Sequence, residues 1–441
     1  MKDWEQYVQT SLSGIAKKAK AQPKYRFRNL YGMLNEKLLG DSWLGIKKSA
    51  ASGVDGVSAR EFEKNLGGNI SDLVEDLKGK RYRGKLVRRK YIPKGQGKMR
   101  PLGIPATRDK LLQLAVARIL RAIWEPEFMR CSYGYRPGVG ARDAVHQLTV
   151  KLQFGKYHYV VEADIRGFFD HVSHSWMLRM LEQRIDDKPF VHLIEKWLKA
   201  GVLEEDGCSI IKPEAGVPQG GIVSPVLANI YLHYVIDLWF HRVFLKTCQG
   251  EGCMIRYADD CIWAFEREEE AERFCRELEE RLAKFGLELS QEKSRTVRFE
   301  RDRGQQRFEF LGFEFYWSRD RNGRPHVKKR TSRKKMRRAL QAFTDWIKAA
   351  RSMKLADLIR KLNSKLRGYF NYYGVIGNYR SLYEFFSLIR RALWKWLSRR
   401  SGRARLSWAK FARRLERFPL QRPSINERRG RRSRTAVCLY W

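Results

Sequence analysis

The segment MIRYADDCIWAF (254–265) constrains the fold most, because it places two adjacent aspartates between two apolar runs. Each run is long enough for a buried strand, and a polar pair between two such runs is typical of a tight turn. We therefore expect an antiparallel β-hairpin with Asp259 and Asp260 at its tip. By itself this pair says little about function, since Asp-Asp turns are often only solvated corners.

Other segments predict a protein of mixed helices and strands. The sequence KLVRRKYIPKGQGKMRPLGIP (85–105) has β-branched residues around a glycine-rich centre and predicts a second hairpin. YHYVVEADI (157–165) predicts a strand that ends near Asp164. Apolar residues at helical spacing predict helices in much of 1–50 and at 109–123, 266–286, 332–350, 355–373 and 381–399. We expect RNGRP (321–325) to link the last three helices to the rest of the chain.

The charge of the chain is large and unevenly distributed. The 441 residues carry a formal net charge of +40, and residues 321–441 hold 35 Lys and Arg against 5 Asp and Glu. A compact protein with this charge repels itself unless a polyanion lies against it, and nucleic acid is the usual polyanion. The composition therefore predicts a nucleic-acid partner, chiefly for the last quarter of the chain.

The sequence also bears on where the protein works. We find no apolar run of the roughly 18 residues needed to cross a bilayer, and the start MKDWEQYVQT lacks the apolar stretch of a secretory signal. The seven cysteines are scattered, which favours free thiols in a reducing compartment. We expect a cytoplasmic protein with no membrane partner.

The three aspartates fit one demanding chemistry. Joining a nucleotide to a primer requires stabilising an attacking and a leaving oxygen at once, which two magnesium ions about 3.5 to 4 Å apart achieve. Magnesium prefers hard oxygen ligands, a few of them carboxylates. A polymerase therefore needs one aspartate at a strand end and others at the tip of a neighbouring hairpin, and Asp164, Asp259 and Asp260 occur in that order.

Motifs along residues 50 to 400 resemble those of reverse transcriptases, and most closely the group II intron reverse transcriptase/maturase family. The similar segments are YIPKGQGKMRPLGIP (91–105), ADIRGFFDHV (163–172), GVPQGGIVSPVLANIYL (216–232), YADD (257–260), FGLELSQEKSR (285–295), FLGF (310–313) and RGYFNYYG (367–374). The resemblance implies an α+β fold, a right-hand polymerase whose fingers and palm contain antiparallel sheet. An all-α basic thumb, the X or maturase domain, is expected to follow.

The resemblance also implies a domain organisation. We expect an N-terminal helical extension at 1–50, fingers and palm at 51–318, a thumb at 319–423 and a basic tail at 424–441. Some members of the family carry a Cys/His-rich HNH nuclease domain after the thumb. Only Cys438 occurs in that part of this sequence, so we expect no such domain here.

Carried over residue by residue, the resemblance assigns catalytic roles. Asp164, Asp259 and Asp260 would hold two Mg²⁺ ions. Lys293 would act as a general acid that protonates the leaving pyrophosphate.

The resemblance assigns a second group of residues to the incoming nucleotide. Lys94 and Arg100 would grip its triphosphate, since charged donors suit a polyanion. The remaining residues of this pocket are Ile165, Gln219 and Gly220. Phe169 would exclude the 2′-hydroxyl of a ribose, with Phe168 as the core residue beside it, although this register is open by one position.

A third group would contact the template and primer. Phe310, Leu311 and Gly312 correspond to the primer grip, and Arg367, Tyr369 and Tyr372 belong to the thumb signature. Basic residues of the thumb would meet phosphates, whereas its aromatic residues either stack on bases or pack the helices together.

The expected function is RNA-directed DNA synthesis. The partners would be an RNA template with a DNA or RNA primer, dNTPs, a DNA target and group II intron RNA, which the protein would help to splice and to move. We expect a monomer or homodimer in the bacterial cytosol, associated with the nucleoid.

Three alternatives remain open at the level of sequence. The first is a domesticated, free-standing relative that serves DNA repair, phage defence or a CRISPR system. The second is a splicing cofactor that no longer polymerises, which the intact carboxylates disfavour. The third is an RNA-dependent RNA polymerase, which Phe169 and the thumb signature disfavour.

Overall fold

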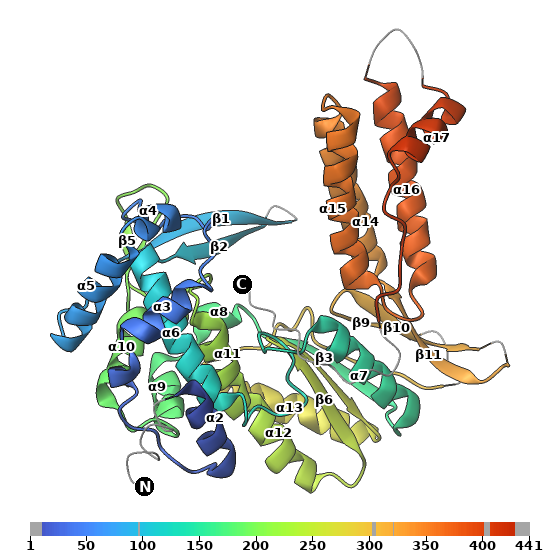
Figure 1. Ribbon diagram of the computed structural model, residues 1–441. Coiled ribbons are helices and arrows are strands. Elements are labelled where there is room, and N and C mark those ends of the chain that lie inside the picture. The colour runs from blue at the N-terminus through green and yellow to red at the C-terminus, as the bar shows by residue number, and fades with distance from the viewer. Residues whose placement is uncertain (1–10, 96–97, 302–305, 321, 401–405, 428–441) are drawn as a thin grey trace.

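The computed structural model describes residues 11–95, 98–301, 306–320, 322–400 and 406–427. Helices and three small sheets form the chain up to about residue 331, and a bundle of long helices follows. Figure 1 shows the bundle rising from one end of the α/β region, opposite the hairpin β1–β2. A mixed α/β region followed by a helical region agrees with the expected order.

The hairpin predicted at 85–105 is confirmed as β1 (Val87–Gly95) and β2 (Lys98–Ile104), which pair antiparallel. With two short strands they form the hairpin sheet, in the order β2-β1-β4-β5, where β4 is Val202–Leu203 and β5 is Ile210–Ile211. The predicted helix at 109–123 is confirmed as α6 (Thr107–Trp124), which is almost wholly buried. The helices packed around it are α2 (Leu12–Ala21), α3 (Glu36–Trp43), α4 (Ala59–Glu63) and α5 (Leu66–Lys78).

The central sheet carries the predicted acidic hairpin. Its order is β6-β7-β3-β8, and each neighbouring pair is antiparallel. The strands are β6 (Gly252–Tyr257), β7 (Asp260–Phe265), β3 (Tyr159–Asp164) and β8 (Arg295–Arg298). Both faces of the sheet are buried, because α13 (Glu268–Lys284) shares one core with Val161 and α7 (Ala141–Phe154) shares another with Val160. Burial on both faces explains why these strands are apolar runs without alternation.

A series of helices connects β3 to β6, and two of them, α8 and α11, lie near the middle of the view in Figure 1. The helices are α8 (Phe168–His171), α9 (His174–Glu182), α10 (Lys188–Leu198), α11 (Ser224–Leu232) and α12 (Leu238–Arg242). A π-helical turn, His233–Asp237, joins α11 to α12. The apolar segment 216–240 therefore forms a loop and then a helix, as its sequence predicts.

The third sheet joins the two parts of the molecule. Its strands are β9 (Phe308–Phe310), β10 (Phe313–Arg319) and β11 (Pro325–Thr331), in the order β11-β10-β9. Phe313, Phe315 and Val327 share the core that α7 forms with the central sheet. The prediction that RNGRP links two domains is wrong, because the segment lies between two paired strands of one hairpin.

The three helices predicted after residue 332 are confirmed as α14 (Arg333–Ala350), α15 (Leu355–Tyr373) and α16 (Tyr379–Ser398), and α17 (Trp408–Arg417) follows. They bury a core of their own that contains Leu358, Phe385 and Ile389. Within the described residues, no helix is long and apolar enough to cross a membrane.

Candidate active site

Two strands of the central sheet bring the acidic residues together. Asp164 is the last residue of β3, and its antiparallel partner is Asp260, the first residue of β7. Tyr257 pairs with Asp260, so Ala258 and Asp259 form a two-residue turn. Ala258 has a φ of 57°, a left-handed conformation that a tight hairpin requires and that costs an alanine energy. The predicted hairpin with acids at its tip is confirmed.

The acidic residues affect one another's charge. Burial and, after it, the neighbouring carboxylates of Asp259 and Asp164 together raise the pKa of Asp260 to about 6. Lys293 lies in the turn that follows α13, where the backbone N–H of Ser290 donates to the carbonyl of Asp164 at 2.8 Å. The ammonium of Lys293 forms an ion pair with the carboxylate of Asp164. The structure therefore brings Lys293 to the carboxylates, as the motif predicts.

These groups also permit a test of the magnesium expectation. In the described parts of the chain, no group of three or more His, Cys, Asp and Glu side chains lies close enough to hold a metal ion. The donors are nevertheless suitable in kind, because carboxylate oxygens are the ligands that magnesium prefers. The carboxylates of Asp259 and Asp164 add to the effect of burial on the pKa of Asp260, and a cation at the site would relieve their mutual repulsion. The chemistry of the site fits a divalent cation on these grounds.

The carboxylates of Asp164 and Asp260 border an open cavity of about 510 Å³. Asp164, Asp260 and Lys293 form one wall, and the turn Phe310–Gly312 with Lys335 and Tyr372 forms another. Leu311 and Gly312 both have positive φ, which lets β9 turn directly into β10. The hydroxyl of Tyr372 donates to the carbonyl of Leu311 at 3.0 Å. The third sheet and the end of α15 therefore meet at the acidic site.

The aromatic residues of RGYFNYYG divide between the site and the core. Tyr372 is 40% exposed and borders the cavity, whereas Tyr369 is only 8% exposed. The ring of Tyr369 stacks on Phe385 with the ring centroids 3.9 Å apart. The ring of Tyr369 therefore packs in the helical core, and the expected contact of Tyr369 with nucleic acid stays a prediction. Arg367, on the same helix α15, is exposed.

The loop 216–223 is held firmly between α8 and the hairpin sheet. The N–H of Val217 donates to the carbonyl of Phe169 at 2.7 Å, and the N–H of Gly103 donates to the carbonyl of Gln219 at 2.5 Å. Gly220 has a φ of 111°, and a Cβ at this position would lie 2.6 Å from the carbonyl oxygen of Gly103. Only glycine permits this approach of the loop to β2.

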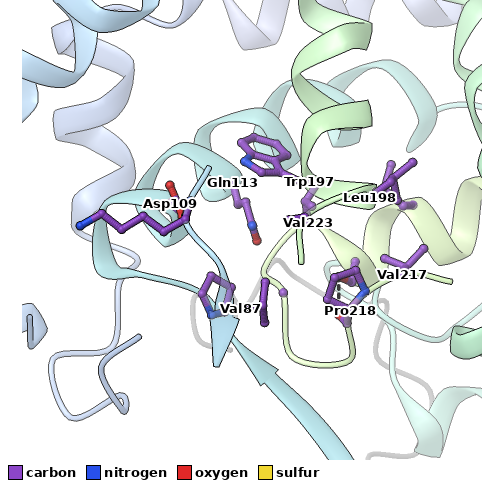
Figure 2. Close-up of a pocket in the computed structure, with 14 residues that line it drawn as sticks. Val87, Asp109, Gln113, Trp197, Leu198, Val217, Pro218 and Val223 are labelled. Carbon is purple, nitrogen blue, oxygen red and sulfur yellow. Dashed lines mark hydrogen bonds between the residues drawn. The ribbon is translucent and has the colours of Figure 1, made fainter. Parts of the chain in front are cut away.

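A small cavity lies behind this loop. Its volume is about 10 Å³, so it has room for about one water molecule and not for a nucleotide. Figure 2 shows Gln113 directed at the loop that carries Val217 and Pro218. The side-chain oxygen of Gln113 accepts a hydrogen bond from the N–H of Ile222 at 3.0 Å. The cavity is a small packing gap, and Gln113 beside it holds the loop in place.

Phe169 is part of α8, and Gln219 lies on the side of the loop next to this helix. Phe168 is 2% exposed and belongs to the core, whereas Phe169 is half-buried and packs on it with ring centroids 5.3 Å apart. The amide of Gln219 donates to Asp170 at 3.2 Å. Of the two phenylalanines, Phe169 is thus the one with accessible surface.

The other predicted nucleotide contacts are placed less uniformly. Arg100 is exposed on β2 opposite Ile92. Ile165 is 5% exposed, so its side chain belongs to the core. Lys94 lies in β1, and its side chain is outside the described residues.

Sequence reasoning missed a buried ion pair directly behind the acidic turn. Arg256 and Asp237 have fully buried side chains whose charged atoms lie 2.5 Å apart. Burial by itself would raise the pKa of Asp237, but the guanidinium of Arg256 lowers it to about 2. A signal existed in the sequence, since each residue is a single charge within an apolar run, in MIRY and in YVIDLW.

Comparison with known proteins agrees with this geometry. Residues 92–315 match the family model described as reverse transcriptase (RNA-dependent DNA polymerase), and residues 326–415 match the maturase-specific domain of group II introns. The group II intron-encoded protein LtrA of Lactococcus lactis is 31% identical over 448 aligned residues, which cover 81% of this chain and 69% of LtrA. The chain belongs to the group II intron reverse transcriptase/maturase family.

Two further relatives of this reverse transcriptase family match shorter segments. Protein YkfC of Escherichia coli is 37% identical over 208 residues, which cover 46% of this chain and 53% of YkfC. A 91 kDa protein in the cob intron of Schizosaccharomyces pombe is 33% identical over 229 residues, covering 51% of this chain and 28% of that protein. The chain thus spans about half of YkfC and somewhat more than two thirds of LtrA.

Proposed function

We propose that this family member is an RNA-directed DNA polymerase that copies RNA by adding deoxynucleotides to a primer. The observation that carries the proposal is the meeting of Asp164 and Asp260 on neighbouring strands, at a cavity that the Phe310–Gly312 turn also borders. A reactive site and a candidate surface for the primer end thus adjoin. The match of the C-terminal helices to the maturase domain favours an intron-type enzyme over a domesticated relative.

In this proposal the parts of the molecule take the names of a right-hand polymerase. The hairpin sheet with α4–α6 forms the fingers, and the central sheet with α7–α13 forms the palm. The helices α14–α17 form the thumb, and the segment before residue 50 is an N-terminal extension. The expected boundary at 318/319 falls within the hairpin β10–β11, so we place the first thumb helix at Arg333. Most of the proposed tail, 424–441, lies outside the described residues.

We assign the metal-binding role to Asp164, Asp259 and Asp260, with two magnesium ions as the proposed cofactor. When bound, these ions would stabilise the attacking and leaving oxygens of the displacement. Lys293 already lies at Asp164, where a protonated amine is suited to give its proton to the leaving pyrophosphate. The sheet holds the acids in place. The longer and more exposed side chain of Lys293 would leave Asp164 to reach the pyrophosphate.

The proposed nucleotide site lies beside the contact between β2 and the loop 216–223, on the side of Phe169 and Gln219. Arg100, together with Lys94, would bind the triphosphate, and the backbone of Ile165 and Gly220 would line the pocket. Gln219 would contact the base or the template. Phe169 has the accessible surface that a barrier to the ribose 2′-hydroxyl requires, whereas Phe168 does not.

The proposed nucleic-acid path runs from the Phe310–Gly312 turn onto the thumb. Tyr372 and Arg367 lie on α15, where Tyr372 borders the cavity and Arg367 is exposed. The partners we propose are an RNA template with a DNA or RNA primer, dNTPs, a DNA target and group II intron RNA. The proposed location is the bacterial cytosol, where these partners are present.

Primer extension on an RNA template tests the proposal. We expect Asp164→Ala and, separately, Asp259→Ala to abolish magnesium-dependent extension, because each removes a carboxylate from the proposed metal site. Template affinity should change little, because neither residue is a basic contact to phosphate. The measurement is incorporation of radiolabelled dNTP beside a filter-binding titration of the same primer-template.

Asp41→Ala is the matched control, because Asp41 is an exposed carboxylate on α3, away from the site. It should extend at the wild-type rate. Extension within tenfold of wild type by either site variant would contradict the assignment of the metal-binding aspartates. Failure of the wild-type protein to extend any RNA-templated primer would contradict the proposed function itself.

A further inference from the structure

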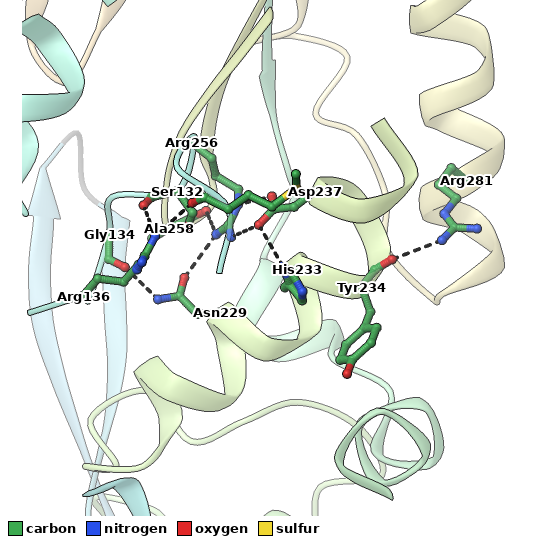
Figure 3. Close-up of polar contacts among 11 residues, drawn as sticks. Ser132, Gly134, Arg136, Asn229, His233, Tyr234, Asp237, Arg256, Ala258 and Arg281 are labelled. Atoms are coloured by element: carbon green, nitrogen blue, oxygen red, sulfur yellow. Dashed lines mark hydrogen bonds and ion pairs between the residues drawn. The ribbon is translucent and has the colours of Figure 1, made fainter. Parts of the chain in front are cut away.

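Arg256 forms the centre of a buried polar network behind the acidic turn. Its guanidinium donates to both carboxylate oxygens of Asp237, at 2.7 and 2.5 Å, and to the side-chain oxygen of Asn229 at 3.1 Å. The same guanidinium donates to the backbone carbonyl of Ala258 at 3.1 Å. Figure 3 shows Arg256 between Asp237 and Asn229, with Ala258 beside it. One side chain thus joins the hairpin to the helices that follow the loop 216–223.

The position of Asp237 depends on an irregular helix. Asp237 is the last residue of the π-helical turn between α11 and α12. A π turn inserts an extra residue into the helix and so rotates the residues after it relative to those before it. Asn229, on α11 before the turn, and Asp237, at its end, therefore both face Arg256. π-Helical turns are rare in proteins, and those that occur are often found at functional sites.

A second segment holds the hairpin from the other side. The N–H of Arg256 donates to the carbonyl of Cys131 at 2.7 Å, and the N–H of Tyr133 donates to the carbonyl of Arg256 at 2.8 Å. Asn229 donates to the carbonyl of Gly134 at 2.7 Å. A Cβ on Gly134 would lie only 2.3 Å from the backbone nitrogen of Ala258. The turn is therefore enclosed between this segment and Arg256.

Stability alone is a weak explanation for this arrangement. A buried ion pair must offset the desolvation of two charges, and apolar residues of similar volume often stabilise a core equally well. Apolar residues could not donate to the carbonyl of Ala258, the left-handed residue that directly precedes Asp259. The hydrogen bond from Arg256 to the carbonyl of Ala258 therefore orients the backbone of the turn, which an apolar side chain could not do.

We propose that Arg256, held by Asp237 and Asn229, is a positioning residue that fixes the Ala258–Asp259 turn and so sets the spacing of the acids at the site. This inference rests on the proposed polymerase function. Arg256 does not touch the reacting atoms in this role. It acts through the backbone carbonyl of Ala258, and loss of the contact should loosen the turn while the rest of the palm stays folded.

Three variants separate positioning from stability. Arg256→Lys keeps the buried charge but loses the forked donors, and Asn229→Ser keeps a small polar group without adding or removing charge. Arg184→Lys is the matched control, because Arg184 is also a buried arginine. It pairs with Glu127 and donates to the carbonyls of Tyr25 and Gln22, none of which belongs to the acidic turn. Each variant is studied in the full chain.

The readouts are the kinetics of extension, the melting temperature, the affinity for Mn²⁺ and the hydrogen exchange of the turn amides. We expect Arg256→Lys to lower kcat at least tenfold with little change in the KM for dNTP. Mn²⁺ binding, followed by electron paramagnetic resonance of the free ion without substrate, should weaken at least fivefold. The amides of residues 257–261 should exchange at least tenfold faster. Asn229→Ser should give smaller changes of the same kind, and Arg184→Lys should lower only the melting temperature.

Two results would overturn the inference while leaving the polymerase function intact. One is a wild-type kcat, Mn²⁺ affinity and exchange rate in both Arg256→Lys and Asn229→Ser. The other is an equal loss of activity in Arg184→Lys, which would reduce the network to a stabilising one. If Arg256→Lys fails to fold, Asn229→Ser decides between the outcomes by the same readouts. Absence of extension by the wild-type protein would instead contradict the proposed function.

Discussion

Phe169 is the residue that we propose to distinguish deoxynucleotides from ribonucleotides. Its neighbour Phe168 is buried in the palm core, whereas Phe169 keeps accessible surface and packs on Phe168. We predict that Phe169→Ala increases ribonucleotide incorporation relative to deoxynucleotide incorporation. The loss of discrimination should be about tenfold or more, because a barrier set by shape alone is worth about 1 to 3 kcal/mol. The measurement is kcat/KM for matched dNTP and NTP.

The paired variant Phe168→Ala should behave differently. Removing a buried phenylalanine ring costs about 3 to 5 kcal/mol, so this variant should lose stability and keep its preference for dNTP. Discrimination lost in Phe168→Ala and kept in Phe169→Ala would show that the assignment is off by one position.

Among the elements, the loop 216–223 connects β2 of the proposed fingers to α8 of the proposed palm through hydrogen bonds to Gly103 and Phe169. Gly220 is the point of closest approach, and the carbonyl of Gly103 leaves no room for a Cβ there. We predict that Gly220→Ala displaces the loop and lowers kcat/KM for dNTP at least about tenfold, since a small misplacement of binding groups is costly in catalysis. Steady-state extension at varied dNTP concentration measures this effect.

A second glycine separates the displacement from backbone strain. Gly207 also has positive φ, 73°, but a Cβ there would meet nothing within 4 Å. Gly207→Ala also places an alanine at positive φ, at a strain of about 1 to 2 kcal/mol, and should extend normally. Equal loss of activity in the two variants would mean that strain, and not the position of the loop, is responsible.

For the whole molecule, the distribution of charge predicts how it holds nucleic acid. Residues 321–441 carry a net charge of +30, and Lys335 of α14 and Tyr372 of α15 border the acidic site. With about 6 to 10 phosphates neutralised, primer-template affinity should fall by about 10³ to 10⁵ between 50 and 200 mM salt. Sequence preference for the primer-template should be slight, because phosphate contacts position without specifying. A fluorescence titration at several salt concentrations measures both.

Variants in which a basic side chain is replaced by glutamine test where these contacts lie. Arg337 and Arg338 are exposed on α14, and replacing both with glutamine should reduce the slope of log affinity against log salt by about 2. The control replaces Lys64 and Lys78 with glutamine, because these exposed residues lie around α5, on the far side of the fingers in Figure 1. An equal change of slope in the control pair would assign the binding to overall charge and not to the thumb.

The sequence by itself determined the features that depend on neighbouring residues. Apolar spacing located the hairpin of Asp259 and Asp260, the strand that ends at Asp164 and the helices after residue 332, because such periodicity follows from burying one face of a regular element. The net charge of residues 321–441 predicted a nucleic-acid partner, because the charge can be counted without knowledge of the fold. Motif order identified the family, which the comparisons show.

Only the tertiary structure decided what depends on residues far apart in the chain. The sequence of RGYFNYYG does not distinguish which of its tyrosines are buried. In the structure, packing against Phe385 buries Tyr369, whereas the hydroxyl of Tyr372 donates to the carbonyl of Leu311. Arg256 and Asp237 read as stray charges in apolar runs until the π turn and the hairpin bring them together. Whether a charge is costly or useful depends on the partners that the fold places around it, and no local pattern contains that information.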